Sequence, residues 1–289
     1  MASDPDMRLP YRILNVFTVA GDRLSGNPLC VFEDGSALTT SQMQALARQL
    51  NLSETTFILP SQTATAAVRI FTPTFEMPFA GHPTLGTAQV VRALRGGDHI
   101  TLEMPAGIVP VTARGDRWEL RAAKEPATQK PIASRTQLAT MVGLDEEALA
   151  GDPLWVNTGS EQLVMPLRSV ADVIRAVADP ARIAQYGFQP GGREAMAYVW
   201  ARASEHEIVA RFFFTQHGAI IEDPATGSAC ANLGGYLLAI GAALPLAATV
   251  QQGVAVGRPS LLGLRITEDR GIYVAGDVVE LGAGVFDAF

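Results

Sequence analysis

Short runs that predict strands alternate with stretches that predict helices through the first 120 residues. Runs rich in β-branched and aromatic residues predict strands at residues 11–19, 29–32, 56–59, 66–71, 100–104, 108–113 and 118–120. Between them, apolar residues recur at helical spacing behind Thr39 and Thr40. This spacing predicts an amphipathic helix that begins at one of these threonines and ends near Asn51.

A second helix is predicted at residues 83–94, and its apolar residues point in most directions. Pro83 suits the first turn of a helix, and a loop rich in Pro and Gly precedes it. A helix that is apolar on most sides has to be surrounded by other elements. We therefore expect the predicted strands to form a strongly bent sheet that encloses this helix.

The second half of the chain repeats this organisation. Residues 122–134 are rich in Lys, Pro, Thr and Gln, which indicates a linker. Beyond it, the pattern predicts helices at residues 135–141, 146–150 and 170–178, and strands at residues 163–166, 197–199 and 208–214. Residues 224–257 carry no formal charge. The Asn, Gly and Pro residues that interrupt this stretch favour a buried helix plus a strand over a membrane span.

Two wholly apolar helices, each behind a glycine-containing loop, have a chemical consequence. The N-terminus of a helix presents unpaired N–H groups and about half a positive charge. The two predicted helices begin near Gly81-His82 and near Gly227-Ser228. If these helix ends face each other across a cleft, they bind a small anion without using Lys or Arg.

Composition narrows the classes of function and location. The chain has 289 residues, which favours two domains, and 48% hydrophobic against 18% charged residues, which is sufficient for a large core. A net charge of −7 without a Lys/Arg cluster argues against nucleic acid as a partner. Only two cysteines are present, and the polar N-terminus lacks the apolar run of a secretory signal. We expect a cytoplasmic protein that does not bind to membranes.

Glu54 and His82 are the candidates for chemistry in the first half. Glu54 lies between apolar Leu52 and Phe57, where burial would raise the pKa of its carboxyl group and make it a proton acceptor near neutral pH. His82 lies at the start of the second predicted helix, whose positive end favours the neutral imidazole. The simpler alternatives are a solvated surface glutamate and a histidine that caps the helix.

Asp223 and Ser228 are the candidates in the second half, just before and just inside the charge-free helix. The simpler alternatives are a loop carboxylate that accepts backbone N–H bonds and a capping hydroxyl. Other chemistries lack their motifs. The four histidines show no metal-ligand spacing, and the nucleophile elbow, the P-loop and the dinucleotide-binding glycine pattern are missing. We therefore expect neither a metal nor a cofactor.

Five segments spread over nearly the whole chain share the order of motifs of a known family. They are Gly26-Asn27-Pro28, Asn51-Leu52-Ser53-Glu54-Thr55, Phe71-Thr72-Pro73 leading to Pro78-Phe79-Ala80-Gly81-His82-Pro83-Thr84-Leu85-Gly86, Glu222-Asp223-Pro224-Ala225-Thr226-Gly227-Ser228-Ala229, and Gly257-Arg258-Pro259-Ser260. The chain thereby resembles the PhzF-like isomerases of phenazine biosynthesis, which are relatives of diaminopimelate epimerase. One segment alone is a weak signal, whereas five in the same order are specific.

The resemblance implies an α+β fold of two similar domains, each a rolled β-sheet or barrel around a central buried helix. The N-terminal domain would cover residues 1–124 and be completed by the last strand, about residues 277–289. The C-terminal domain would cover residues 125–276. The active site would lie in the cleft between the domains, and the protein would form a homodimer.

The resemblance also implies an activity without a cofactor. The glutamate takes a proton from a carbon of a small anionic carboxylate substrate, such as dihydro-hydroxyanthranilate, and returns it elsewhere. The implied catalytic residues are Glu54, His82, Asp223 and Ser228. The implied substrate-binding residues are Gly81, Thr226 and Gly227. Backbone groups at the two glycines would bind substrate oxygens and stabilise the enol-like charge that develops.

The epimerase relatives differ, since they use two cysteines at the helix mouths. Here Cys230 falls inside the predicted helix and Cys30 lies on an early strand, so we expect both in the core. Gln216 and Ala219 stand where the family pattern has Pro and Gly, which affects the shape of the second loop. The remaining alternatives are a two-base epimerase that uses Glu54 and Asp223, and a regulatory protein that binds an anion without turnover.

Overall fold

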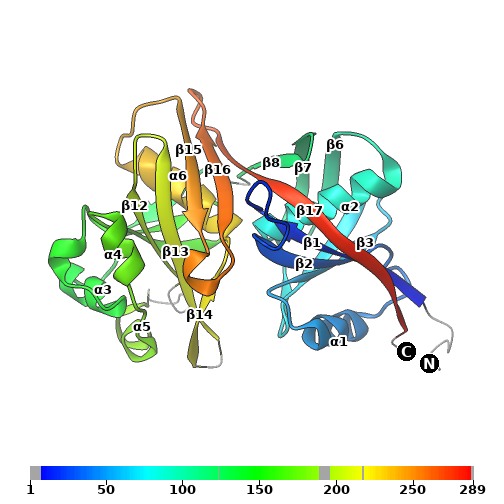
Figure 1. Cartoon of the computed structure of the whole chain (residues 1–289), viewed down its shortest axis with the longest axis horizontal. Coiled ribbons are helices and arrows are strands. Elements are labelled where there is room, and N and C mark those ends of the chain that lie inside the picture. The colour runs from blue at the N-terminus through cyan, green and yellow to red at the C-terminus, as the bar shows by residue number, and fades with distance from the viewer. Residues whose placement is uncertain (1–7, 123, 189–195, 217, 288–289) are drawn as a thin grey trace. The chain divides into compact units, whose positions relative to one another are not determined.

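The computed structural model describes residues 8–122, 124–188, 196–216 and 218–287 (Figure 1). The chain divides into two compact units, Met1–Arg121 with Ala275–Phe289, and Ala122–Val274. Each unit combines one curved sheet with helices, which confirms the predicted α+β class.

The sheet of the first unit closes on itself. Its strands pair in the ring β1-β2-β3-β4-β6-β7-β8-β17 and back to β1, while the short β5 extends β4. The bounds are β1 (Arg8–Val16), β2 (Asn27–Phe32), β3 (Thr55–Leu59), β4 (Ala66–Phe71), β5 (Glu76–Met77), β6 (His99–Met104), β7 (Gly107–Arg114), β8 (Arg117–Arg121) and β17 (Ile272–Asp287). A closed ring has no exposed sheet edge, so every strand of it is paired on both sides.

Helix α2 (Gly81–Arg95) is the helix that this ring encloses. It contacts all the ring strands that precede the second unit, and ten of its residues are buried, which confirms the predicted enclosure. A Cβ atom at Gly86 would lie 2.5 Å from Leu29 Cδ2 and 3.0 Å from Val16 Cγ2. Glycine at this position therefore allows the helix to approach β1 and β2 closely.

Helix α1 (Thr40–Leu50) covers the outside of the same sheet. Thr39 and Gln42 form a capping box at its start, and Asn51 ends it in the left-handed conformation with a φ of 52°. Met43 and Leu46 are buried in a cluster with Phe57. Both ends and the buried face agree with the sequence prediction.

The second unit repeats the pairing scheme of the first. Antiparallel and parallel pairs alternate along β10-β11-β12-β13-β15-β16, as they do along β1-β2-β3-β4-β6-β7. The bounds are β9 (Ala127–Gln129), β10 (Leu154–Asn157), β11 (Glu161–Pro166), β12 (Ala197–Arg202), β13 (Glu207–Gln216), β14 (Ala219–Asp223), β15 (Leu246–Gln252) and β16 (Ser260–Ile266). Strand β14 extends β13 as β5 extends β4, so the two units have duplicated topologies.

Helix α6 (Gly227–Ala239) takes the place of α2 in the second unit and contacts β9, β10, β11 and β16. A Cβ atom at Gly235 would lie 2.8 Å from Val156 Cγ1, so glycine again allows a close approach. The charge-free segment thus forms a buried helix followed by strand β15, as predicted. Among the described residues, no helix has the length and hydropathy needed to cross a bilayer.

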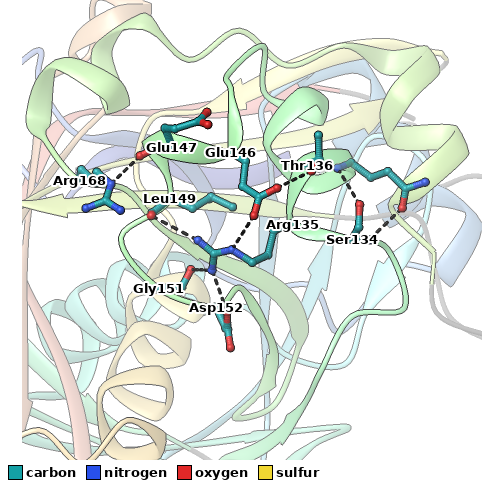
Figure 2. A network of polar contacts seen from close by, with 10 residues as sticks. Ser134, Arg135, Thr136, Glu146, Glu147, Leu149, Gly151, Asp152 and Arg168 are labelled. Carbon is teal, nitrogen blue, oxygen red and sulfur yellow. Dashed lines mark hydrogen bonds and ion pairs between the residues drawn. The ribbon is translucent and has the colours of Figure 1, made fainter.

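The outer helices of the second unit are short: α3 (Arg135–Met141), the 3-10 helix η1 (Glu146–Ala148), α4 (Val170–Arg175) and α5 (Pro180–Tyr186), with a second 3-10 turn, η2 (Val254–Val256), after β15. Arg135 fixes the first two, because its guanidinium donates to Glu146 Oε1 at 3.3 Å, to Asp152 Oδ1 at 2.7 Å and to the carbonyl of Gly151 at 2.7 Å (Figure 2). One side chain thereby holds three separate turns of the chain.

Several sequence predictions for these outer elements are wrong. The helix predicted at residues 170–178 ends at Arg175, because Ala176 is extended and Val177 N–H donates to the carbonyl of Val142. A separate helix, α5, then begins behind the capping residue Asp179. The segment predicted as a linker contains β9, which pairs with β10.

Candidate active site

Glu54 and His82 lie next to each other in the first unit. Glu54 directly precedes β3, and His82 is the second residue of α2. His82 Nε2 lies 3.5 Å from Glu54 Oε2, and the two side chains are only 5% and 15% exposed. The surface glutamate that we considered as an alternative is therefore excluded. A carboxyl group and an imidazole that are mostly withdrawn from water can exchange a proton.

The tautomer of His82 is fixed by the hydrogen bond that its second ring nitrogen forms, and its protonation state by burial. The ring hydrogen-bonds to the backbone carbonyl of Pro28, and Nε2 has no hydrogen-bond partner in the described part of the chain, so the donor to Pro28 is Nδ1. Burial lowers the pKa of the His82 imidazole to about 3, although the bond to Pro28 opposes this shift. The imidazole is therefore neutral at pH 7, and Nε2 faces Glu54 as an acceptor.

This burial predicts a pH dependence of stability. The unfolded chain takes up a proton at His82 below its ordinary pKa of about 6.5, while the native state stays neutral down to a pKa of about 3. The unfolded state thus binds more protons in this window, so the native state is destabilised as the pH falls through it. We expect this residue to contribute at most about 1.4 kcal/mol of lost stability per pH unit.

The matched variant for this prediction is His82→Asn, whose amide N–H can still donate to the carbonyl of Pro28. Urea unfolding at pH 7, 6 and 5 should give a flatter dependence of the free energy of unfolding on pH in the variant than in the wild type. Equal slopes in the two proteins would contradict the burial of a neutral imidazole.

The turn Gly26-Asn27-Pro28 supports both Glu54 and His82, a role that we did not predict from the sequence. The carbonyl of Pro28 orients His82, and the fully buried Asn27 accepts through Oδ1 from Ser53 Oγ at 3.1 Å, next to Glu54. A backbone carbonyl leaves no signal in a sequence, so the role of Pro28 could not be predicted. Asn27 stands in the segment Gly26-Asn27-Pro28, which carried the family resemblance but to which we assigned no role in the site.

The remaining predicted residues gather at the start of α6 in the second unit. Asp223 ends β14, Thr226 is the N-cap of α6, and Gly227 and Ser228 form its first turn. Thr226 Oγ1 donates to Asp223 Oδ2 at 2.5 Å. Gln252 Nε2 donates to the carbonyl of Asp223 at 2.8 Å and to Thr226 Oγ1 at 3.0 Å. Asp223 is thus held by the helix start and by β15.

Strand β14, which ends at Asp223, is anchored by a buried ion pair. Arg211 contacts Glu222 through two hydrogen bonds of 3.0 and 2.7 Å, and the side chains are 15% and 9% exposed. Gln216 and Ala219, which depart from the family pattern, pair with each other in the β13–β14 hairpin. The hairpin that leads to Asp223 is therefore ordinary antiparallel sheet at these two positions.

The first turns of α2 and α6 differ from those of the other α-helices. Helices α1, α3, α4 and α5 all have an N-cap side chain that accepts from the backbone. No such cap bond occurs at Ala80 before α2 or at Thr226 before α6. Gly81 and Gly227 are the first residues of these two helices. A helix N-terminus without a side-chain cap is the end that can bind an anion.

The structure therefore forms two groups from the predicted residues, each within its own unit. The first unit joins Gly81, His82 and Glu54, and the second joins Asp223, Thr226, Gly227 and Ser228. The seven residues were predicted from motifs far apart in the sequence, and the fold gathers each group at the N-terminus of its enclosed helix.

The two cysteines, Cys30 and Cys230, belong to neither group of predicted site residues. Cys30 and Cys230 are fully buried, which confirms the prediction that they are core residues. Burial raises the pKa of each thiol to about 12, so both are protonated near neutral pH. Within the described ranges, no three His, Cys, Asp or Glu side chains gather as they would around a metal ion.

The first unit also has a cavity of about 560 Å³, which is separate from the two groups of predicted site residues. Ser61 Oγ and Thr63 Oγ1 in its wall both donate to Glu103 Oε2, at 2.5 and 2.9 Å, so these groups bind each other. Its lining residues are Leu59, Pro60, Ser61, Gln62, Thr63, Ala67, Val68, Arg69, Glu103, Met104 and Pro105. None of the predicted site residues lines it.

Comparison with known proteins supports the family resemblance that the order of sequence motifs indicated. The family described as phenazine biosynthesis-like protein, PhzC-PhzF, matches residues 14–284. An uncharacterised isomerase of Pasteurella multocida (strain Pm70) is 37% identical over 277 residues, which cover 95% of this chain and 92% of that protein. The trans-2,3-dihydro-3-hydroxyanthranilate isomerase of Pseudomonas aeruginosa is 34% identical over 269 residues, covering 88% and 89% of the two chains.

Solved structures share the fold. A phenazine biosynthesis protein of the PhzF family from Bacillus anthracis superposes with a TM-score of 0.84 at 22% identity, over 97% of this chain and 99% of that one. A predicted epimerase from Pseudomonas aeruginosa gives a TM-score of 0.81 at 29% identity, over 97% and 100%. The chain belongs to the PhzC-PhzF family of phenazine biosynthesis-like proteins, and it is an isomerase.

Proposed function

We propose that this isomerase moves a proton between two carbons of a small carboxylic acid without a cofactor, and that Glu54 carries the proton. The observation that supports this role is the contact between Glu54 Oε2 and the acceptor Nε2 of a neutral, buried His82, at 3.5 Å. A carboxyl oxygen that faces an acceptor nitrogen can bind it only when the carboxyl group is protonated. The pair is therefore suited to hold a transferred proton.

The proposed reaction has two steps. The Glu54 carboxylate first takes a proton from a carbon of the substrate, and the electron pair of the broken C–H bond is delocalised towards the carboxylate or a conjugated double bond. The protonated Glu54, hydrogen-bonded to His82 Nε2, then returns the proton to a second carbon, and the double bond shifts. Atoms and charge balance, since the enzyme ends in its initial state.

The second part of the proposal concerns the charge that develops on the substrate. Backbone N–H groups at Gly81 and Gly227 lie in the uncapped first turns of α2 and α6, where they favour a negatively charged oxygen. Thr226 and Ser228 supply hydroxyl groups, and Asp223 supplies a carboxyl group. We propose that these residues bind and orient the substrate while Glu54 moves the proton.

The first substrate to test is trans-2,3-dihydro-3-hydroxyanthranilate. Proteins of Pseudomonas aeruginosa and Pseudomonas chlororaphis that are named for its isomerisation are 34% and 33% identical to this chain. It is a small cyclic carboxylic acid whose ring keeps two conjugated double bonds, which suits a proton shift by one carboxyl group.

Removal of metals and small cofactors should leave the activity intact. We expect protein dialysed against EDTA to retain its full turnover of this substrate, because a carboxyl group and an imidazole supply the proton-transfer chemistry. Product analysis by NMR and chiral chromatography would distinguish a shifted double bond from an inverted centre, the latter being the result for a two-base epimerase. Loss of activity on EDTA treatment that added metal restores would contradict the proposal.

A further inference from the structure

Two buried side-chain amides and the residue Thr158 form a hydrogen-bonded chain in the second unit that ends on Ser228, called the amide chain below. Its members are Thr158, which follows β10, Asn232 on α6 and Gln162 on β11, and their exposed fractions are 4%, 0% and 2%. Ser228 and Asn232 lie one turn apart on the same face of α6. Gln162 bridges the two from the neighbouring strand.

The orientation of the Asn232 amide is fixed by backbone groups on both sides. Its Oδ1 accepts from the backbone N–H of Thr158 at 2.9 Å and from Thr158 Oγ1 at 2.7 Å. Its Nδ2 donates to the backbone carbonyl of Ser160 at 2.8 Å. A backbone N–H can only donate and a backbone carbonyl can only accept, so the reverse orientation of this amide would bring like groups together.

This orientation determines the direction of the next two hydrogen bonds. Asn232 Nδ2 also donates to Gln162 Oε1 at 2.7 Å, so the other end of the Gln162 amide is the NH2 group. Gln162 Nε2 then donates to Ser228 Oγ at 2.9 Å. Because Ser228 Oγ accepts this bond, its own hydroxyl proton has to point away from Gln162.

We propose that Gln162 and Asn232 are positioning residues that keep the hydroxyl of Ser228 a hydrogen-bond donor towards the substrate. The inference deepens the proposed function, because it depends on the binding of a substrate oxygen by Ser228. A hydroxyl that turns freely donates in this direction only part of the time. The amide chain removes the competing acceptor and holds the donor in place before the substrate arrives.

The competing explanation for these hydrogen bonds is that they only dock the β10–β11 hairpin on α6. This explanation does not require the bond from Gln162 to Ser228. The bonds from Asn232 to Thr158 and Ser160 already join the helix to the hairpin. The bond from Gln162 to Ser228 is an additional bond between the helix and the hairpin, and it lies next to the proposed substrate-binding hydroxyl. Gln162 is also neutral, so it orients a donor without repelling a substrate carboxylate.

A double-mutant cycle separates the two explanations. We expect Gln162→Met to lower kcat/KM for trans-2,3-dihydro-3-hydroxyanthranilate about 10-fold, and Ser228→Ala to lower it about 10²-fold. The double variant should lose no more than Ser228→Ala alone, because Gln162 acts through the serine hydroxyl. A double variant that loses the product of the two factors, about 10³-fold, would overturn the positioning role while leaving the proposed function intact.

Tyr236→Phe is the matched control for stability. Tyr236 lies on the same helix, and its hydroxyl donates to the carbonyl of Asp152 at 3.0 Å, so the variant loses one buried hydrogen bond outside the amide chain. We expect a melting temperature about 2–4 °C lower and unchanged kcat/KM. If the loss of kcat/KM in Gln162→Met is no larger than in Tyr236→Phe, the result would contradict the proposal. An unchanged kcat/KM in Ser228→Ala would overturn both the inference and the proposed role of Ser228.

A measurement without substrate tests the orientation itself. In the NMR spectrum of the wild type, we expect the side-chain NH2 signals of Gln162 and Asn232 to exchange slowly with solvent. In Ser228→Ala the Gln162 signal should shift, since its acceptor is removed, while a Gln162 signal unaffected by the substitution would contradict the proposed hydrogen bond. This result does not depend on which carboxylic acid the enzyme isomerises, and it remains informative if Gln162→Met fails to fold.

Discussion

Glu54→Gln is expected to lower kcat by about 10²- to 10⁴-fold, the range by which a positioned general acid–base group accelerates proton transfer. The amide cannot take a proton from carbon. Its NH2 group can still donate to His82 Nε2, which lies 3.5 Å from the carboxyl oxygen in the wild type. The variant should therefore fold and bind substrate while its turnover, measured as product formed per enzyme, is almost lost.

Glu54→Asp is the graded control for this result. It keeps the carboxyl group but withdraws it by one methylene group, and a misplacement of about 1 Å costs about 10² in rate. We expect its kcat to lie between the values of the wild type and Glu54→Gln, with unchanged circular dichroism in both variants. A Glu54→Gln enzyme that retains more than a tenth of the wild-type turnover would exclude Glu54 as the essential acid–base group.

Arg211→Met is expected to lower the free energy of unfolding by about 3–5 kcal/mol, the cost of removing one partner of a buried ion pair. Arg211 forms two hydrogen bonds with the buried Glu222, and its Nη1 also donates to the carbonyls of Val173, Ile174 and Ala176 at 3.2, 3.0 and 2.6 Å. The substitution leaves the Glu222 carboxylate buried without its cation. Urea denaturation at pH 7 measures the loss.

The double variant Arg211→Met with Glu222→Met is the informative control. Removal of both partners leaves no uncompensated charge, and such pairs are often replaced by apolar side chains at little cost. We expect the double variant to be more stable than Arg211→Met alone. Both variants lack the carbonyl contacts of Arg211, so a double variant that is the less stable of the two would contradict the uncompensated Glu222 charge as the cause of the loss.

The enclosed helices could be predicted because their composition is unusual. Residues 83–94 and 224–257 lack the polar face that a surface helix requires, so enclosure followed from the sequence alone, and α2 and α6 are enclosed. The α1 boundaries were equally accessible, because Thr39 and Asn51 act locally as cap residues. These predictions needed no knowledge of contacts between distant segments.

Elements that depend on distant partners escaped prediction. Strand β9 is fully exposed along its length and exists only because it pairs with β10. Strands β10 and β16 were likewise not predicted, since alternation in these short segments is weak without their neighbours. The predicted helix at residues 146–150 is a single 3-10 turn, which Arg135 holds through Glu146.

The residues of the candidate site could be predicted from local sequence motifs, whereas the groups that orient them could not. Glu54, His82, Asp223 and Ser228 stand in recognisable motifs, and the structure gathers them at two helix starts. The roles of the groups that orient them leave no signal in the sequence. The carbonyl of Pro28 is a backbone atom, and the amide chain through Gln162 and Asn232 joins residues about 70 positions apart in the sequence.

Exchange of carbon-bound hydrogen in deuterated water tests the central claim most directly, because it follows the proton itself. Wild type and Glu54→Gln would each be incubated with trans-2,3-dihydro-3-hydroxyanthranilate in D2O. Proton NMR would follow the signals of the carbon-bound hydrogens. We predict that the wild type introduces deuterium at carbon during turnover and that Glu54→Gln does not. Exchange by Glu54→Gln at the wild-type rate would contradict the proposal that Glu54 carries the proton.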